Sequence, residues 1–89
     1  MLTGEQIRAA RALLRIEQAE LAERSGISLP TIKRLEKTQG PVGGLARTAA
    51  SVQQVLEKAG IAFLDEDEEL GVGVRLVKGA AAKAADTDA

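Results

Sequence analysis

The chain has 89 residues, the size of one domain, and contains neither cysteine nor histidine. Disulfides, thiolate chemistry, ordinary zinc sites and an imidazole base are therefore excluded, which removes most familiar enzyme chemistry. The net charge is −1, but residues 1–47 carry eight Lys or Arg against five Glu, whereas the remainder carries four against eight acidic residues, so a polyanion would meet the N-terminal half.

Two helices are predicted at the start of the chain. The first covers residues 4–14, because Thr3 and Gln6 have the spacing of a capping box and apolar residues then recur at helical intervals. The second covers residues 18–24 and is ended by Gly26, since glycine favours the left-handed conformation that follows many helices. This second helix is short.

A third helix follows after a brief turn and is basic. Ser28 is a suitable N-cap, and Pro30 fits the second helical position, where a missing amide proton costs little. Ile32 and Leu35 have the spacing of core residues. The basic residues that this arrangement leaves outside are Lys33, Arg34 and Lys37.

A fourth helix is predicted after a loop. Glycine and proline mark residues 39–44 as the loop, because both residues interrupt helices and strands. The helix ends at Gly60. It starts near Leu45 or, if Thr48 is the N-cap, about three residues later.

A β-hairpin and a tail complete the chain. Residues 61–64 and 72–77 are rich in β-favouring residues and are predicted as strands, with the acidic run 65–69 at the tip between them. Residues 79–89 contain no large apolar side chain and are expected to be a mobile tail. The folded domain is therefore predicted to be residues 1–78.

The second and third helices have the spacing of a helix-turn-helix. The small side chain of Ala22 lets two helices cross at close range, and Gly26 supplies the left-handed turn between them. The residues placed to fill the wedge between these helices and the first helix are Leu21, Ile27, Ile32 and Leu35. These matched positions, followed by a basic helix, are a fairly specific signal.

A resemblance to the phage-repressor-like (Cro/repressor, or XRE-type) helix-turn-helix family is carried by QAELAERSGISLPTIKRLEKTQG, residues 18–40. It extends over about residues 3–64, and residues 58–78 are similar to a bacterial subgroup in which a short hairpin follows the last helix. The resemblance implies a mainly α, lambda-repressor-like domain of four helices with a C-terminal β-hairpin. It also implies binding to double-stranded DNA.

In this family the second helix of the motif enters the major groove, where its early exposed residues meet base edges. The resemblance places Gln18 at the DNA backbone, where it also supports the reading helix. Thr31 is either a further DNA contact or a helix-packing residue. The base contacts that the resemblance implies are Ser28, Leu29, Pro30, Lys33 and Arg34, and the phosphate contacts are Lys37, Thr38, Gly43 and Gly44.

The sequence departs from the family pattern at two positions. Glu17 replaces the usual Ser or Thr cap, and Leu29 stands where a polar residue is usual, so its expected readout is contact with a thymine methyl group. Outside the motif, Arg8, Arg11 and Arg15 are spaced as a stripe that we expect to be solvated, with Arg15 best placed for phosphate.

Other chemistry is not expected. The acidic run 65–69 resembles a calcium loop only vaguely, because Leu70 stands where the required glycine belongs. Ser25, Ser28 and Ser51 have no base to activate them. We therefore predict no enzyme activity, no metal site and no cofactor.

The favoured function is a sequence-specific transcriptional regulator, and a repressor because a single domain acts most simply by occupying an operator. The alternative is a protein-interaction module, such as an antitoxin or an antiactivator, in which the same fold binds a protein partner. Leu29 and the net acidity keep this alternative open. Neither a signal-peptide pattern nor an apolar run of membrane-spanning length occurs in the sequence, so a cytoplasmic location is expected.

A homodimer on a two-fold symmetric operator is also expected. Only 24 apolar residues are larger than alanine, and one motif of this size reads only a few base pairs. The candidate interfaces are the hairpin, through Val72, Val74 and Leu76, and the fourth helix, through Val55. The sequence does not choose between them.

Overall fold

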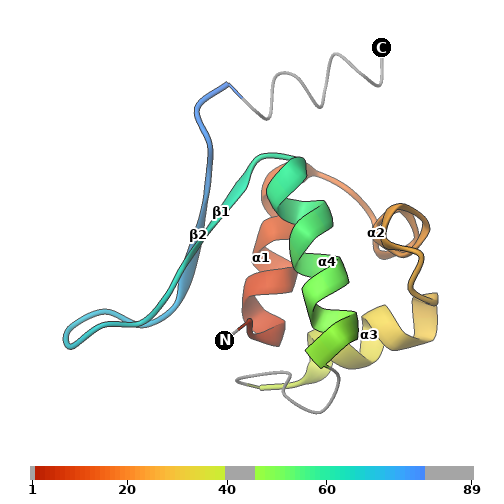
Figure 1. The fold of residues 1–89 in the computed structure, drawn as a ribbon, viewed down its shortest axis with the longest axis horizontal. Helices are drawn as coiled ribbons and strands as arrows, with labels where there is room; N and C mark the ends of the chain where they lie inside the picture. Colours follow the sequence, from red (N-terminus) through yellow and green to blue (C-terminus); the bar gives the residue numbers. More distant parts are fainter. Residues whose placement is uncertain (1, 40–45, 80–89) are drawn as a thin grey trace.

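The computed structural model describes residues 2–39 and 46–79, which form four helices and one two-stranded sheet (Figure 1). The predicted fold class, mainly helical with a hairpin after the last helix, is confirmed. The helices are α1 (Gly4–Leu14), α2 (Gln18–Ser25), α3 (Leu29–Lys37) and α4 (Ala46–Lys58), and the strands are β1 (Ile61–Leu64) and β2 (Gly73–Leu76).

The ends of the first two helices follow the local sequence. The capping box of α1 is complete, because Thr3 Oγ1 accepts a hydrogen bond from the Gln6 amide at 3.1 Å and Gln6 Oε1 accepts one from the Thr3 amide at 2.9 Å. The C-cap of α1 is Arg15, whose φ of 58° lies in the left-handed region, and the C-cap of α2 is Gly26 with a φ of 71°. The chain can therefore turn sharply twice within twelve residues.

The start of α4 differs from one of the two predicted positions. Thr48 lies inside α4, whose described part begins at Ala46, so the prediction of Thr48 as the N-cap is wrong. Alanines on both sides of Thr48 favour helical structure, so the helix extends to residues before Thr48. The rest of the predicted loop, the alternative start at Leu45 and nearly all of the predicted tail lie outside the described residues.

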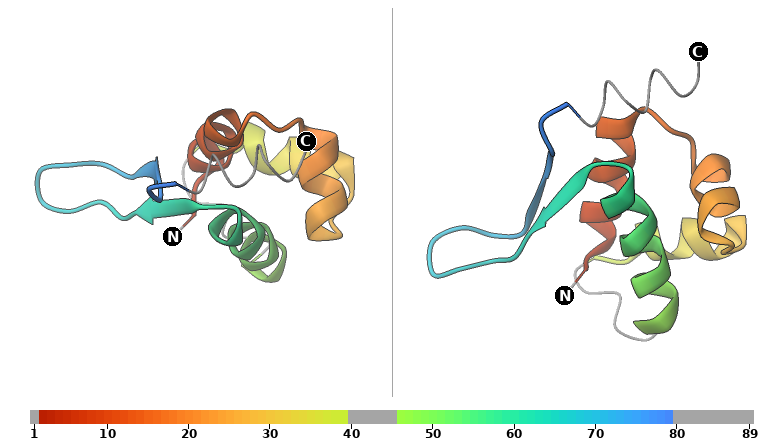
Figure 2. Two further views of the ribbon diagram at one scale, coloured as in Figure 1. Left: turned by 90° about the horizontal axis from the view of Figure 1, so that it is seen from above. Right: turned by 45° about the horizontal axis from the view of Figure 1, so that its top comes forward.

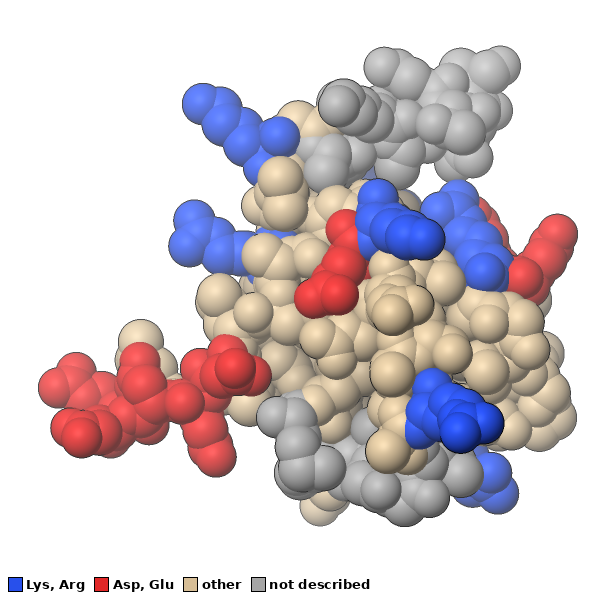
Figure 3. Space-filling model, viewed as in Figure 1, with Lys and Arg blue, Asp and Glu red and all other residues tan. Residues whose placement is uncertain are grey.

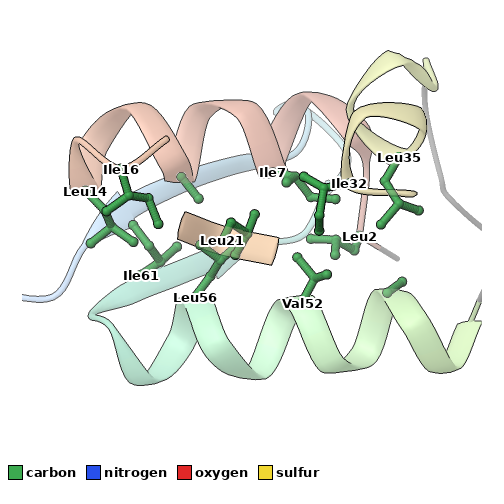
Figure 4. Packing of buried hydrophobic residues seen from close by; sticks show 12 residues of the cluster. Leu2, Ile7, Leu14, Ile16, Leu21, Ile32, Leu35, Val52, Leu56 and Ile61 are labelled. Carbon is green, nitrogen blue, oxygen red and sulfur yellow. The ribbon is translucent and has the colours of Figure 1, made fainter. Parts of the chain in front are cut away.

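The core lies where all four helices meet the first strand (Figure 4). In that view the core side chains fill the space between α1 and α4, with Leu21 of α2 among them. Each helix and β1 contribute at least one side chain that is almost fully shielded from solvent. The largest of these are Ile7, Leu21, Ile32, Leu35, Val52, Leu56 and Ile61.

The hairpin packs against the helices at its base. Its strands are antiparallel with Ile61 opposite Leu76, and β1 lies beside α4 while β2 lies beside α1. The strand predicted over residues 72–77 is shorter by one residue at each end, so Val72 precedes it and is exposed. Val74 and Leu76 are half-buried against the core of their own chain. Part of the hairpin face that the sequence predicts as a dimer interface is therefore covered by the chain itself.

The side chain of Gln6 joins α1 to both strands. Gln6 is only 3% exposed, and its Nε2 donates to the carbonyl oxygens of Leu64 at 3.2 Å and Gly73 at 3.0 Å. Leu64 and Gly73 are opposite each other in the hairpin. One amide therefore closes the capping box with its oxygen and holds the hairpin with its nitrogen.

Candidate nucleic-acid interface

α2 and α3 form the predicted pair of short helices, joined by a left-handed turn at Gly26. An added side chain at Gly26 would meet nothing within 4 Å, so the backbone conformation rather than crowding requires glycine here. Leu21 from α2 and Ile32 from α3 are completely buried, and Ile27 of the turn packs against the same cluster. The wedge of apolar side chains predicted from the spacing is therefore confirmed.

Ser28 fixes the start of α3. Its hydroxyl oxygen accepts a hydrogen bond from the Thr31 amide at 3.4 Å and donates one to Thr31 Oγ1 at 2.9 Å. Pro30 lies in the first turn, where its missing N–H leaves no bond unmade. The Thr31 hydroxyl thus takes part in the cap, and its contact with DNA stays a prediction.

The outer side of α3 is basic. Ile32 and Leu35 face the core, whereas Lys33, Arg34 and Lys37 are exposed. Figure 3 shows Lys and Arg side chains distributed over the helical body, while acidic side chains gather on the hairpin tip at the left. A polyanion that approaches the outer side of α3 therefore avoids the acidic end of the molecule.

Several of the other predicted DNA contacts lie at the two ends of α3, namely Ser28, Leu29, Pro30 and Thr38. Thr38 ends the helix, and its hydroxyl donates to the Arg34 carbonyl oxygen at 3.1 Å. Gly43 and Gly44 lie outside the described residues. Of the remaining predicted contacts, Ser28 and Pro30 are exposed, and Leu29 and Gln18 are half-buried.

A buried ion pair ties α3 to α1. Glu36 of α3 is 3% exposed, and its carboxylate accepts two hydrogen bonds from Arg11, one from Nε at 2.9 Å and one from Nη2 at 3.0 Å. Arg11 Nη1 also donates to the Ile16 carbonyl oxygen at 3.1 Å, and Gln18 Nε2 donates to Glu36 Oε1 at 3.2 Å. The first residue of α2 thus supports α3 directly, while its contact with DNA remains predicted.

The expectation that Arg11 belongs to a solvated stripe is wrong. Its side chain is 21% exposed, and the hydrogen bond to Glu36 raises the pKa of Arg11 above its ordinary value, against the opposing effect of burial. The helical spacing does hold a signal for both partners. Glu36 follows Ile32 by four residues, and Arg11 follows Ile7 by four, which places each on the core side of its helix.

Glu17 is the N-cap of α2, a position where Ser or Thr is usual. Glu17 makes no side-chain hydrogen bond to the first turn, so the cap is as weak as its identity predicts. Its negative charge does contribute to the raised pKa of Arg11. On the outer side of α2, Arg24 forms an ion pair with Glu20, so the one basic side chain of that helix is already paired.

The described ranges contain no cluster of three His, Cys, Asp or Glu side chains suited to hold a metal ion. Across the same ranges, no helix is both long and apolar enough to cross a bilayer.

Comparison with known protein families gives a match over the first three helices. Residues 7–41, which run from α1 through α3, match a family model described as Helix-turn-helix. No curated protein matches the chain. The match spans the buried ion pair, the left-handed turn and the basic helix described above. Residues 7–41 therefore carry a helix-turn-helix of the XRE, Cro/repressor-like type, which supports a role in DNA binding.

Proposed function

We propose that this protein is a cytoplasmic transcriptional repressor that binds a two-fold symmetric operator as a homodimer, with α3 in the major groove. The basic outer side of α3 is the observation that supports this most directly. Its three cations are exposed on a short helix whose opposite side is fixed by Ile32, Leu35 and the Glu36 ion pair. A reading helix needs this rigidity, because base contacts depend on fixed side-chain positions.

The predicted DNA contacts are of two chemical kinds, contacts to bases and contacts to phosphate. Lys33 and Arg34 can donate to the acceptor atoms of guanine, and Leu29 can contact a thymine methyl group. Lys37 and Thr38, at the end of the helix, are suited to phosphate, which fixes orientation without reading sequence. The contacts to bases should therefore determine which operator sequence is bound. The contacts to phosphate should determine the affinity for DNA of any sequence.

The first test removes the two central cations of α3. Lys33→Ala/Arg34→Ala should weaken operator binding by about 1 to 3 kcal/mol for each base that the variant no longer reads, with little change in stability because both side chains are exposed. Fluorescence anisotropy on an operator selected from random DNA measures the fall in affinity. Lys37→Ala should weaken selected and unrelated DNA alike.

The matched control removes two exposed cations elsewhere. Arg8→Ala/Lys58→Ala changes the net charge by the same amount on α1 and α4. Its decrease in affinity should be clearly smaller than that of the α3 variant. Equal decreases in both double variants would show that α3 acts only through overall charge, and would overturn its assignment as the reading helix.

The second test concerns the dimer. Val72 and Val77 are both exposed, at 38% and 52%, and flank β2 on either side, but only Val72 belongs to the predicted interface. Val72→Arg should sediment as a monomer at micromolar concentration, whereas Val77→Arg should remain a dimer. A dimeric Val72→Arg variant would move the interface to Val55 on α4, and a wild-type monomer that binds an asymmetric site with full affinity would refute the dimer.

The alternative function remains a protein-interaction module built on the same fold. Leu29 in the first turn of α3 and the net acidity favour it. DNA binding that depends steeply on salt would support the repressor, since released counterions accompany phosphate contacts. Co-purification with one protein partner, together with absent DNA binding, would support the alternative.

A further inference from the structure

The end of the hairpin forms a projecting arm, which we define as residues 64–71. It extends from the body on the side opposite α2 and α3 (Figures 1 and 2). Its turn is internally bonded, because the Asp67 amide donates to the Leu70 carbonyl oxygen and Asp67 Oδ1 accepts from the amides of Glu69 and Leu70, each at 2.8 Å. These amide bonds also lower the pKa of the Asp67 carboxyl. The backbone of the turn is therefore held by three hydrogen bonds.

The arm exposes apolar side chains to solvent. Leu70 at the tip is 67% exposed, the largest value for any large apolar residue in the described ranges, and Leu64 is 41% exposed. Scattered exposed leucines are common, but here they lie on a projecting segment that contributes nothing to the core. Their placement indicates contact with another molecule.

A small recess lies at the base of the arm. Its volume is about 70 Å³, and it is lined by Leu2, Gln6, Gln53, Phe63 and Asp65. Pockets that hold whole small-molecule ligands are usually about 300 Å³ or more, so this one has room only for the end of a side chain. A carboxylate beside an aromatic ring is suited to an ammonium or guanidinium group.

The negative charge of the arm indicates which class of partner it can bind. Between residues 59 and 74 the chain has five acidic residues and no Lys or Arg. DNA would be repelled, and the arm of a second copy would be repelled equally, because like charges would meet, so the dimer contact proposed at Val72 has to leave the two arms apart. The occupant that this charge fits is a basic segment of another protein.

We propose that the arm is a docking site for a basic segment of a partner protein, with a lysine or arginine head in the recess beside Asp65 and an aliphatic side chain against Leu70. This site lies apart from α3, so it allows a partner to bind while the reading helix is on DNA. It does not depend on the proposed repressor function.

The test uses two synthetic nine-residue peptides, one with alternating arginine and leucine and one with alternating arginine and glycine. Titrated into the ¹⁵N-labelled full chain, the first peptide should shift amide signals of residues 61–71 and bind at least about tenfold more tightly than the second. Asp65→Asn should weaken this binding about tenfold, as expected for loss of one charge-assisted pair. Leu70→Ser should reduce the preference for the leucine peptide.

Matched variants distinguish specific binding at the recess from non-specific electrostatic attraction. Glu68→Gln removes the same charge as Asp65→Asn but does not line the recess, and Val77→Ser removes an exposed apolar residue outside the arm. Both should bind the leucine peptide within about twofold of the wild type. Equal weakening by Asp65→Asn and Glu68→Gln would overturn the proposal, as would equal binding of the two peptides. Self-association of the wild type that Asp65→Asn abolishes would also overturn it, because the occupant would then be a second copy.

Discussion

Arg11→Met is expected to destabilise the protein by about 3 to 5 kcal/mol, because it leaves the buried Glu36 carboxylate without its cation. Glu36→Gln should cost less, about 1 to 3 kcal/mol, because Arg11 is 21% exposed and keeps its bond to the Ile16 carbonyl oxygen. Small domains are stable by only about 5 to 15 kcal/mol. The first substitution therefore brings the protein close to unfolding at room temperature.

Urea unfolding followed by far-ultraviolet circular dichroism measures both changes in stability, since the chain has no Trp or Tyr for fluorescence. Arg11→Met/Glu36→Leu provides the control. It removes both charges and leaves apolar groups of similar size, so it should recover much of the stability that Arg11→Met alone removes. Equal destabilisation by the two single variants would contradict the asymmetry, and a double variant as unstable as the sum of the singles would contradict the role of the uncompensated charge.

Gly4→Ala is expected to cost about 3 kcal/mol or more, although alanine is the better helix former. A Cβ at this position would lie 2.5 Å from the Leu35 carbonyl oxygen and closer still to that of Thr38. Both oxygens are backbone atoms at the end of α3 and cannot rotate away as a side chain does. The variant must therefore separate the start of α1 from the end of α3.

Gly71→Ala is the matched control, because a Cβ there meets nothing within 4 Å. It should change the free energy of unfolding by no more than about 0.5 kcal/mol. Thermal unfolding distinguishes the two, since each kilocalorie lowers the Tm of a domain this size by roughly 4 to 8 °C. A Gly4→Ala variant as stable as Gly71→Ala would show that the two helices do not approach so closely.

Features fixed by neighbouring residues were predictable from the sequence. The capping box at Thr3, the turn at Gly26 and the cap at Ser28 each depend on side chains within three or four positions of the backbone they serve. For the same reason the exposed cations of α3 were predictable, because helical spacing alone separates them from Ile32 and Leu35.

Features that join distant segments were not predictable. Nothing near Gly4 indicates that α3 ends against it. Helical spacing places Arg11 on the core side of α1, but its partner Glu36 lies 25 residues away along the chain, so the pairing itself was not visible. The role of Gln6 in its cap is visible from Thr3, but its second role toward the hairpin spans most of the chain. The partial burial of Val74 likewise depends on how the hairpin docks on α1.

The double role of Gln6 sets an order of events during synthesis. Its bonds reach 58 and 67 positions ahead along the chain, so on the ribosome α1 emerges long before the strands that its amide will hold. Contacts among the helices span shorter loops and close at lower entropic cost. The Gln6 nitrogen must therefore stay hydrated until Gly73 has left the exit tunnel, and docking of the hairpin follows the emergence of the helices.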